Sequence, residues 1–370
     1  MITLDQEKRL KLLRFAETLL DPTSARIIIQ PQKQETGYWF GGGNLVSAPD
    51  GAWYLVGRYR NYGDSRTGLE AGLRGVELAV FVSCDHGKTF EKILSFSKSD
   101  LSNADRPVLS IEGSALHFIP GGVELFVSTE KGNVPYPENL KSFHKSGTGI
   151  WSIDRLQAKN VCDLTRAKIS PLLLCEDPRF LHVKDPVVYD RVNGGTLLSF
   201  CTHPYNWASS NSGLAIRNPG SEVFADQNYE FFRRGYTWDV AISRITAWLR
   251  VPRRGAFSQE PALLLAFYDG GESMRNLDEH PQAIRRSRGY SCEEIGGLAW
   301  AYEDDLSSIT RVSVNLPAFI SPWGSGSSRY VDVLHAEDGL YATWEQSQPD
   351  LSQPLVMNYL GWDAIDRLLA

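Results

Sequence analysis

Five polar residues occupy the same place in five similar segments of the chain. Each one follows a loop and stands at the start of an apolar run: Asn44, Glu112, Asp185, Asp239 and Arg329. Three of these residues are carboxylates, which can exchange protons with a reacting group. An arginine fork binds carboxylate or phosphate oxygens, and an amide binds hydroxyl groups or a water molecule. Brought together, these side chains predict acid–base chemistry on a polar substrate.

Further polar and aromatic side chains end the apolar runs that come next or lie in the loops that follow them. Aromatic faces stack on the C–H surfaces of sugars, while amide, imidazole and carboxylate groups bind hydroxyls. The alternative for the arginines is a role in surface ion pairs. The expected substrate-binding residues are Asn44, Arg58, Arg60, Glu130, His203, Trp238, Asp269, Glu272, Arg275, Arg329 and Tyr330. We expect no metal and no cofactor, because the acidic loops have no EF-hand pattern.

The five segments share a layout that indicates repeated antiparallel sheets. Each has an apolar strand, a turn such as Pro49-Asp50-Gly51 or Asn193-Gly194-Gly195, and a second apolar strand. The five polar residues are separated by 68, 73, 54 and 90 positions, enough for one four-stranded blade at each step. The last interval is wide because residues 268–295 read as an inserted loop. The pattern predicts an all-β five-bladed β-propeller over residues 25–370. Two stacked β-sandwiches explain the strands but not the recurring polar residue.

The two ends of the chain complete this picture. Leu10, Leu13, Ala16 and Leu20 recur at helical spacing, which predicts an N-terminal amphipathic helix within residues 1–24, packed on the domain. A swapped arm in a dimer is the alternative. The fifth unit lacks one strand, and Arg26 to Gln30 can supply it and close the ring, which removes an exposed sheet edge.

Composition excludes several classes of partner. The formal net charge of −6 is spread without a basic block, which argues against nucleic acid. The five cysteines are scattered and contain no CxxC pair, which predicts neither disulfides nor a zinc site. Neither an export signal nor a membrane-spanning run is visible. We therefore expect a cytoplasmic protein with no membrane partner, and a homodimer remains open.

An eight-residue segment, Ser83-Cys84-Asp85-His86-Gly87-Lys88-Thr89-Phe90, fits the pattern S-x-D-x-G-x-T-F/W. It resembles the Asp-box hairpin of sialidases and other propellers. In this hairpin the Asp carboxylate caps backbone N–H groups of the turn and the Gly takes the positive φ. The resemblance implies a structural role away from the catalytic mouth.

A second segment, Lys184-Asp185-Pro186-Val187, resembles the Asp-Pro that opens an inner strand in five-bladed glycosidases such as arabinanases, invertases and the mannoside phosphorylases. The resemblance implies three carboxylates at the starts of inner strands, and the candidates are Glu112, Asp185 and Asp239. Asp185 would orient the acid and tune its pKa, while Glu112 and Asp239 would divide the acid and base roles. One carboxyl must be protonated and another ionised for glycoside cleavage. The alternative is that each carboxylate caps its own turn.

The sequence departs from this family pattern where Asn44 replaces the usual catalytic Asp of the first unit. An amide is no general base, but such a site is compatible with attack by phosphate. Arg58, Arg60 and Arg329 resemble the arginine trio of sialidases, although the Arg-Ile-Pro motif of that family is absent. The first hypothesis is a glycoside hydrolase acting on a terminal or small glycoside, with arginines binding an anionic group. A noncatalytic sugar-binding propeller, a glycoside phosphorylase and a polysaccharide lyase using Tyr59 or His203 beside Arg58 remain open.

Overall fold

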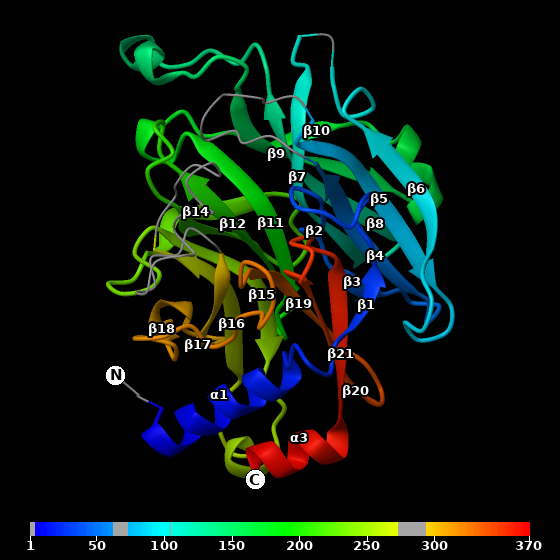
Figure 1. The fold of residues 1–370 in the computed structure, drawn as a ribbon, viewed down its shortest axis with the longest axis vertical. Coiled ribbons are helices and arrows are strands. Elements are labelled where there is room, and N and C mark those ends of the chain that lie inside the picture. Colours follow the sequence, from blue (N-terminus) through cyan, green and yellow to red (C-terminus); the bar gives the residue numbers. More distant parts are fainter. Residues whose placement is uncertain (1–3, 62–72, 104, 273–293) are drawn as a thin grey trace.

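The computed structural model describes residues 4–61, 73–103, 105–272 and 294–370. Within them, five antiparallel sheets surround a common centre, which confirms the predicted five-bladed β-propeller (Figure 1). The first blade contains β2 (Trp39–Gly41), β3 (Leu45–Ser47), β4 (Trp53–Arg60), β5 (Gly75–Ser83) and β6 (Glu91–Ser97). The second contains β7 (Val108–Ile119), β8 (Gly122–Lys131), β9 (Ile150–Ala158) and β10 (Ser170–Leu173).

The remaining blades follow in chain order, and the ring closes between the two ends of the chain. The third contains β11 (His182–Asp190), β12 (Thr196–His203), β13 (Asn211–Arg217) and β14 (Phe224–Phe232). The fourth contains β15 (Ile242–Arg250), β16 (Leu263–Gly271), β17 (Ile295–Tyr302) and β18 (Thr310–Arg311). The fifth contains β19 (Ser328–His335), β20 (Gly339–Gln346), β21 (Leu355–Gly361) and β1 (Arg26–Ile29), and β1 pairs antiparallel with β21.

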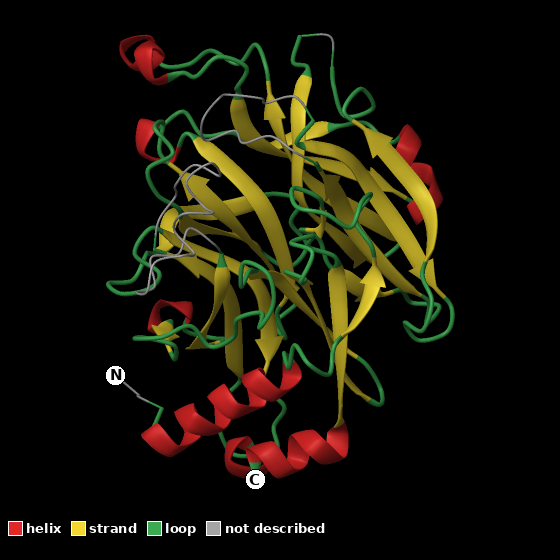
Figure 2. Cartoon of the chain, viewed as in Figure 1, coloured by secondary structure: helices red, strands yellow, loops and turns green. Residues whose placement is uncertain are grey.

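Two helices lie together at one end of the molecule (Figure 2). Helix α1 (Gln6–Leu19) begins after Asp5, whose carboxylate accepts a hydrogen bond from the Lys8 N–H at 2.8 Å, as N-cap residues do. It buries Phe15 and Leu19 against the fourth and fifth blades, and α3 (Trp362–Leu369) packs on the same core. None of the helices in the described residues has the length and apolar character needed to cross a bilayer.

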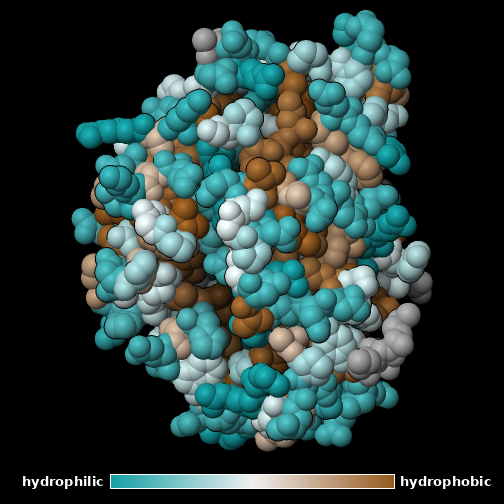
Figure 3. Space-filling view, turned by 180° about the vertical axis from the view of Figure 1, so that it is seen from behind, coloured by the Kyte–Doolittle hydropathy of each residue, from teal (hydrophilic) through white to brown (hydrophobic). Residues whose placement is uncertain are grey.

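Apolar side chains fill each gap between neighbouring blades, so the core is divided into five wedges. Each sheet lies between two others, so both of its faces are buried. Strands with β-branched and aromatic residues on both faces suit this position. The wedge between the first two blades is typical and contains Val56, Leu78, Leu116 and Val127. Hydrophilic side chains predominate on the face shown in Figure 3, where hydrophobic ones form a strip through its upper half.

The hairpin between β5 and β6 contains the eight-residue turn. The Asp85 carboxylate accepts hydrogen bonds from the Thr89 backbone N–H at 2.9 Å and from the Thr89 hydroxyl at 2.6 Å. Ser83 links Asp85 to the N–H of Gly87, which has φ +78°. These bonds fix the turn without any contribution from the centre of the ring.

Candidate active site at the propeller mouth

Bulges in three inner strands bring polar side chains to the centre of the ring. The register of β7, β11 and β19 breaks where two residues face one on the neighbouring strand, at Glu112-Gly113, Asp185-Pro186 and Tyr330-Val331. Asp185 has φ +55° and Tyr330 has φ +54°, a left-handed conformation that costs a residue with a side chain about 1–3 kcal/mol. Such strain at matching positions of two blades makes these bulges the candidate site.

A second set of polar residues comes from the strand next to each inner strand. Each inner strand has a residue one or two positions before its bulge whose register pair includes a polar or charged side chain, and the second-strand partner is charged in four of the five blades. These register pairs are Gly41 with Arg58, Ser110 with Glu130, Lys184 with Cys201, Arg244 with Asp269, and Arg329 with Glu345.

Eight of these charged groups form a closed ring of alternating sign, here called the charge ring. Arg58 lies between Glu112 (3.2 Å) and Glu345 (3.1 Å), and Arg329 lies between Glu345 (2.7 Å) and Glu294 (3.0 Å). Arg244 then joins Glu294 (2.6 Å) to Asp185 (3.1 Å). The Lys184 ammonium stands between Asp185 (3.9 Å) and Glu112 (4.0 Å) and completes the ring. All five blades contribute to it.

Tyr330 is enclosed by the charge ring. Its hydroxyl accepts a hydrogen bond from Arg58 at 3.3 Å and donates to Asp185 at 3.4 Å. The guanidinium of Arg244 lies 4.1 Å from the centre of the tyrosine ring and that of Arg58 lies 4.9 Å away, within the range of cation–π attraction. Burial raises the pKa of Tyr330 well above its ordinary value, so the phenol keeps its proton.

The charge ring is tight at the arginines and open at Lys184. The two contacts of its ammonium exceed hydrogen-bond length, and the side chain retains 13% exposure. The ammonium also lies 5.2 Å from the ring centre of Trp151 and 6.0 Å from that of Trp207. Glu112, Asp185 and Lys184 therefore face one another beside an aromatic wall.

That aromatic wall is built around Trp207. The indole stacks on His182 with ring centres 3.9 Å apart and contacts His203 at 4.7 Å. His203 lies 3.2 Å from the Cys201 sulfur and 3.0 Å from the Ser209 carbonyl. Burial lowers the pKa of His203 and of His182 well below the ordinary value. Both imidazoles are therefore neutral at physiological pH and add no charge to the wall.

The environment of each carboxylate sets its protonation. Burial alone would raise the pKa of Glu112, but the charges of Arg60, Lys184 and Arg58 hold it well below its ordinary value. Arg60 also forms a direct ion pair with Glu112. Burial raises the pKa of Asp269 to about 7, against the charge of Arg244. Glu112 is therefore ionised at neutral pH, while Asp269 holds a proton in mildly acidic solution.

Asp239 lies apart from the carboxylates with which the sequence grouped it. We expected it at the start of an inner strand, but β15 begins at Ile242 and its break in register lies between Ile245 and Ala247. The Asp239 carboxylate accepts hydrogen bonds from Arg311 (2.6 Å) and from the Tyr268 hydroxyl (3.1 Å). Trp238 stacks on the same tyrosine, with ring centres 5.6 Å apart. In this blade the residue of β15 that contacts the central carboxylates is Arg244, and Asp239 does not.

In the first blade, too, the residue at the bulge is not the one that we expected. Gly42, with φ +65°, occupies the bulge, and a side chain there would collide with the Arg58 guanidinium, 2.2 Å from the position of its Cβ. Asn44 exchanges two hydrogen bonds with the Leu116 backbone, at 2.8 and 2.9 Å. Its amide therefore joins the first blade to the second.

The other predicted residues fall at different depths around the mouth. Arg60 and Arg329 lie over the ring of Trp39, 5.3 and 5.1 Å from its centre. Glu130 forms a buried ion pair with Arg74 and accepts a hydrogen bond from Gly149 at 2.6 Å. Glu272 directly follows β16. Arg275 lies outside the described residues.

Sequence reasoning missed four members of the charge ring. Lys184 was read only as part of a motif, and Arg244, Glu294 and Glu345 were not selected. The usable signal is a charged residue at the end of an apolar second strand, because Glu345 follows Ala342-Thr343-Trp344 as Asp269 follows Ala266-Phe267-Tyr268. Within the described residues, no cluster of three or more histidine, cysteine or acidic side chains is placed to hold a metal ion.

Comparison with known proteins supports the architecture. No family model and no curated protein matches the sequence. A solved structure titled glycoside hydrolase matches 96% of this chain and 96% of its own, with a TM-score of 0.59 and 11% identity. The α-L-arabinofuranosidase from Lactobacillus brevis matches over 90% and 92%, with a TM-score of 0.56 and 11% identity. The β-1,2-mannobiose phosphorylase from Listeria innocua matches over 92% and 96%, with a TM-score of 0.55 and 11% identity. At this identity the likeness establishes a shared fold.

Proposed function

We propose that the protein is a glycoside hydrolase whose reaction takes place at the Lys184 opening of the charge ring, between Glu112 and Asp185. The separation of these two carboxyl groups carries the proposal. Each has an oxygen about 4 Å from the same ammonium, so the two oxygens are no more than about 8 Å apart, and glycosidase carboxyl pairs lie ~5–10 Å apart. A noncatalytic sugar-binding propeller has no need of such a pair.

The two carboxyl groups take different roles because their surroundings differ. Three cations face Glu112, which keeps it ionised as base or nucleophile. Asp185 accepts hydrogen bonds from the Gly113 N–H at 2.9 Å and from Arg244 at 3.1 Å, which hold it in one orientation. With Glu112 as base or nucleophile, Asp185 is the carboxyl group at the opening that takes the acid role.

The cations around the opening favour a substrate with an anionic group. Arg58 and Arg329 share Glu345, and Arg60 and Arg329 share the Trp39 ring. Arg60 and Arg329, which are partly exposed, would bind a sugar carboxylate as in a sialidase-like enzyme, while the buried Arg58 holds the glutamates beside them. Guanidinium forks suit such a group.

A glycoside phosphorylase is the second candidate. Gly42 stands at the bulge of the first blade, so this blade contributes no carboxylate there. Arg60 and Arg329 would hold an attacking phosphate, and the β-1,2-mannobiose phosphorylase shares the fold. Phosphate dependence of the cleavage separates the two reactions.

The test is a screen of aryl glycosides and acidic oligosaccharides, each assayed with and without phosphate. Glu112→Gln and Asp185→Asn should each lower kcat by about 10²–10⁴-fold, the usual contribution of a positioned acid or base. Glu138→Gln changes a glutamate whose side chain is 84% exposed and serves as the matched control. Circular dichroism must show that all variants are folded. Full activity in both Glu112→Gln and Asp185→Asn would exclude the proposal, and an unsaturated product would instead identify a lyase.

A further inference from the structure

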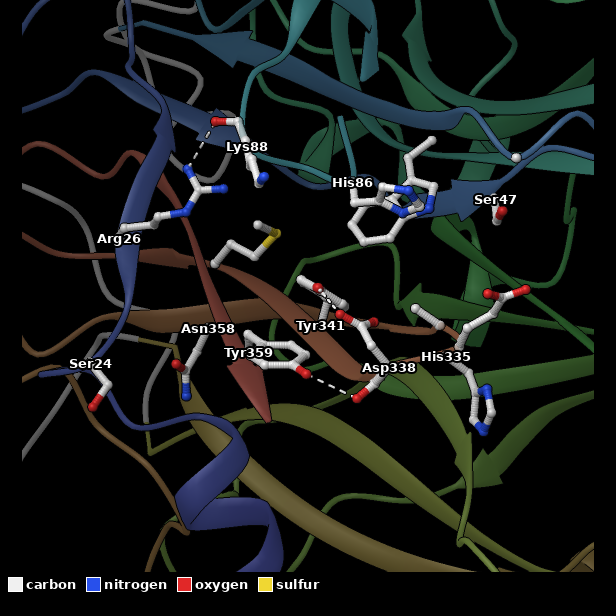
Figure 4. Close-up of a pocket in the computed structure, with 15 residues that line it drawn as sticks. Ser24, Arg26, Ser47, His86, Lys88, His335, Asp338, Tyr341, Asn358 and Tyr359 are labelled. Atoms are coloured by element: carbon white, nitrogen blue, oxygen red, sulfur yellow. Dashed lines mark hydrogen bonds between the residues drawn. The ribbon is translucent and has the colours of Figure 1, made fainter. Parts of the chain in front are cut away.

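A second cleft lies between the first and fifth blades, where the ring closes (Figure 4). The β5–β6 turn forms one side, and the β19–β20 turn with the end of β21 forms the other. These turns join strands at the end of the propeller opposite the charge ring, because neighbouring strands are antiparallel. The cleft has a volume of about 790 Å³, within the range of small-molecule sites.

Aromatic rings form its floor and one wall. Trp53 and Tyr341 are buried and meet at 71° with ring centres 4.7 Å apart. Tyr359 continues the surface, 4.7 Å from Tyr341, and is 45% exposed. An exposed tyrosine beside buried aromatic rings offers a flat apolar face at the point where a ligand enters.

This aromatic surface is held in place by one loop residue. The Asp338 carboxylate accepts a hydrogen bond from the Tyr341 hydroxyl at 2.8 Å, and its backbone carbonyl accepts one from the Tyr359 hydroxyl at 2.9 Å. Arg26 donates to the carbonyls of Gly87 and Lys88, which ties the opposite turn to β1. A ligand would meet a site that needs little ordering.

The rim offers hydrogen-bond donors and acceptors with balanced charge. His86, with φ +57°, and Lys88 project from the β5–β6 turn. In the part of the chain that the structure describes, neither the His86 ring nor the Lys88 ammonium has a hydrogen-bond partner. The two cations, Arg26 and Lys88, face two anions, Glu337 and Asp338. This balance favours a neutral polar ligand over a polyanion.

The geometry points to a saccharide-binding site in this cleft, with neutral oligosaccharides as its ligands. The exposed ring of Tyr359 would bind the C–H face of a sugar, and a mixed rim of donors and acceptors would bind its hydroxyls. The choice of a saccharide rests on the proposed function, since an enzyme that cleaves glycosides gains from a second site that binds neutral sugar units of its substrate.

A second cavity adjoins the cleft on the side of the propeller axis. It has a volume of about 650 Å³, is lined by all five inner strands and shares Ser47 and His335 with the cleft.

The experiment measures binding of xylotriose, arabinotriose and β-1,2-mannobiose by isothermal titration calorimetry. Tyr359→Ala and Lys88→Ala should each weaken binding of at least one sugar tenfold or more. Tyr236→Ala removes a tyrosine that is 99% exposed elsewhere and should leave binding unchanged. Glu112→Gln, which changes the charge ring, should keep the binding event that Tyr359→Ala loses.

The outcomes separate this inference from the proposed function. Binding lost in Tyr359→Ala but retained in Glu112→Gln supports the cleft even if the enzyme cleaves none of the glycosides. Unchanged binding in Tyr359→Ala and Lys88→Ala, or no binding of any of the three sugars, would overturn the inference even if glycosidase activity is found.

Discussion

Arg244 faces more negative charge than one guanidinium can neutralise. It binds Asp185 at 3.1 Å, Asp269 at 2.7 Å and Glu294 at 2.6 Å, and its side chain is 2% exposed. Burial would raise the pKa of Glu294, but Arg244 and Arg329 hold it well below its ordinary value. Asp269, whose pKa burial raises to about 7, is therefore the member of this cluster that carries the proton.

The pH dependence of the free energy of unfolding should reveal whether Asp269 holds a proton in the folded state. An unfolded Asp titrates near ~3.9, so between that pH and about 7 the folded state holds a proton that the unfolded chain has released. The proton on Asp269 stabilises the folded state fully below the unfolded pKa. This stabilisation is lost as the pH rises through the folded pKa, by about 1.4 kcal/mol for each unit between the two pKa values. Relative to Asp269→Asn, the parent protein should lose stability from pH 4 to 7 in urea denaturation.

The control for this measurement is Asp304→Asn, since Asp304 is exposed. Its difference from the parent protein should not change over the same pH range. A flat difference for Asp269→Asn as well, or a parent that gains stability with pH relative to it, would show that Arg244 keeps Asp269 ionised.

At the scale of elements, the sequence predicted the strand repeat but placed two blades out of phase, the first at Asn44 and the fourth at Asp239. Glu112 and Asp185 are followed by Gly and Pro, residues that accompany a break in a strand. The segment from Trp238 has the same polar and apolar order, yet Val240 is 44% exposed and belongs to a loop. An apolar residue in a loop cannot be distinguished from the start of a strand by its type alone.

The charge ring could not be predicted from local sequence patterns. Arg244 and Glu294 are 50 positions apart in the chain, and Arg58 and Glu345 are 287 apart. Their contacts depend on the closure of all five blades and on the twist of each sheet. The sequence therefore predicted the fold and selected Glu112, Asp185, Arg58 and Arg329, while the contacts that join them through Arg244, Glu294 and Glu345 required coordinates.

Helix α1 illustrates how an element outside the sheets supports them. Phe15 is fully buried in the core that α1 shares with the fourth and fifth blades, whereas Leu10 on the same helix is 47% exposed. Phe15→Ala should lower the free energy of unfolding by about 3–5 kcal/mol, because it leaves a cavity that the sheets cannot fill. Leu10→Ala should change it by less than about 0.5 kcal/mol. Guanidinium denaturation followed by circular dichroism measures both, and equal effects would mean that the helix does not contribute to the core.

At the scale of the whole molecule, the charge ring joins blades that are far apart in the chain. Six of its eight contacts are 3.2 Å or shorter, and Arg58 and Arg244 are each fully buried. Desolvation of so many charges is costly, and mutual attraction repays it only when every partner is present. The ring should therefore respond to mutation as one unit.

A double-mutant cycle tests this cooperation between blades. Arg58→Met and Arg244→Met should each cost about 3–5 kcal/mol, since each leaves buried carboxylates without a cation. Together they should deviate from additivity by more than about 0.5 kcal/mol, because both lie against Tyr330 and the same run of charges. Arg250, which binds Glu303 at 2.8 Å, lies outside the ring, so Arg58→Met with Arg250→Met should be additive. Additivity in both pairs would mean that each arginine serves its own blade, and the mouth would then be five adjacent ion-pair sites instead of one preorganised centre.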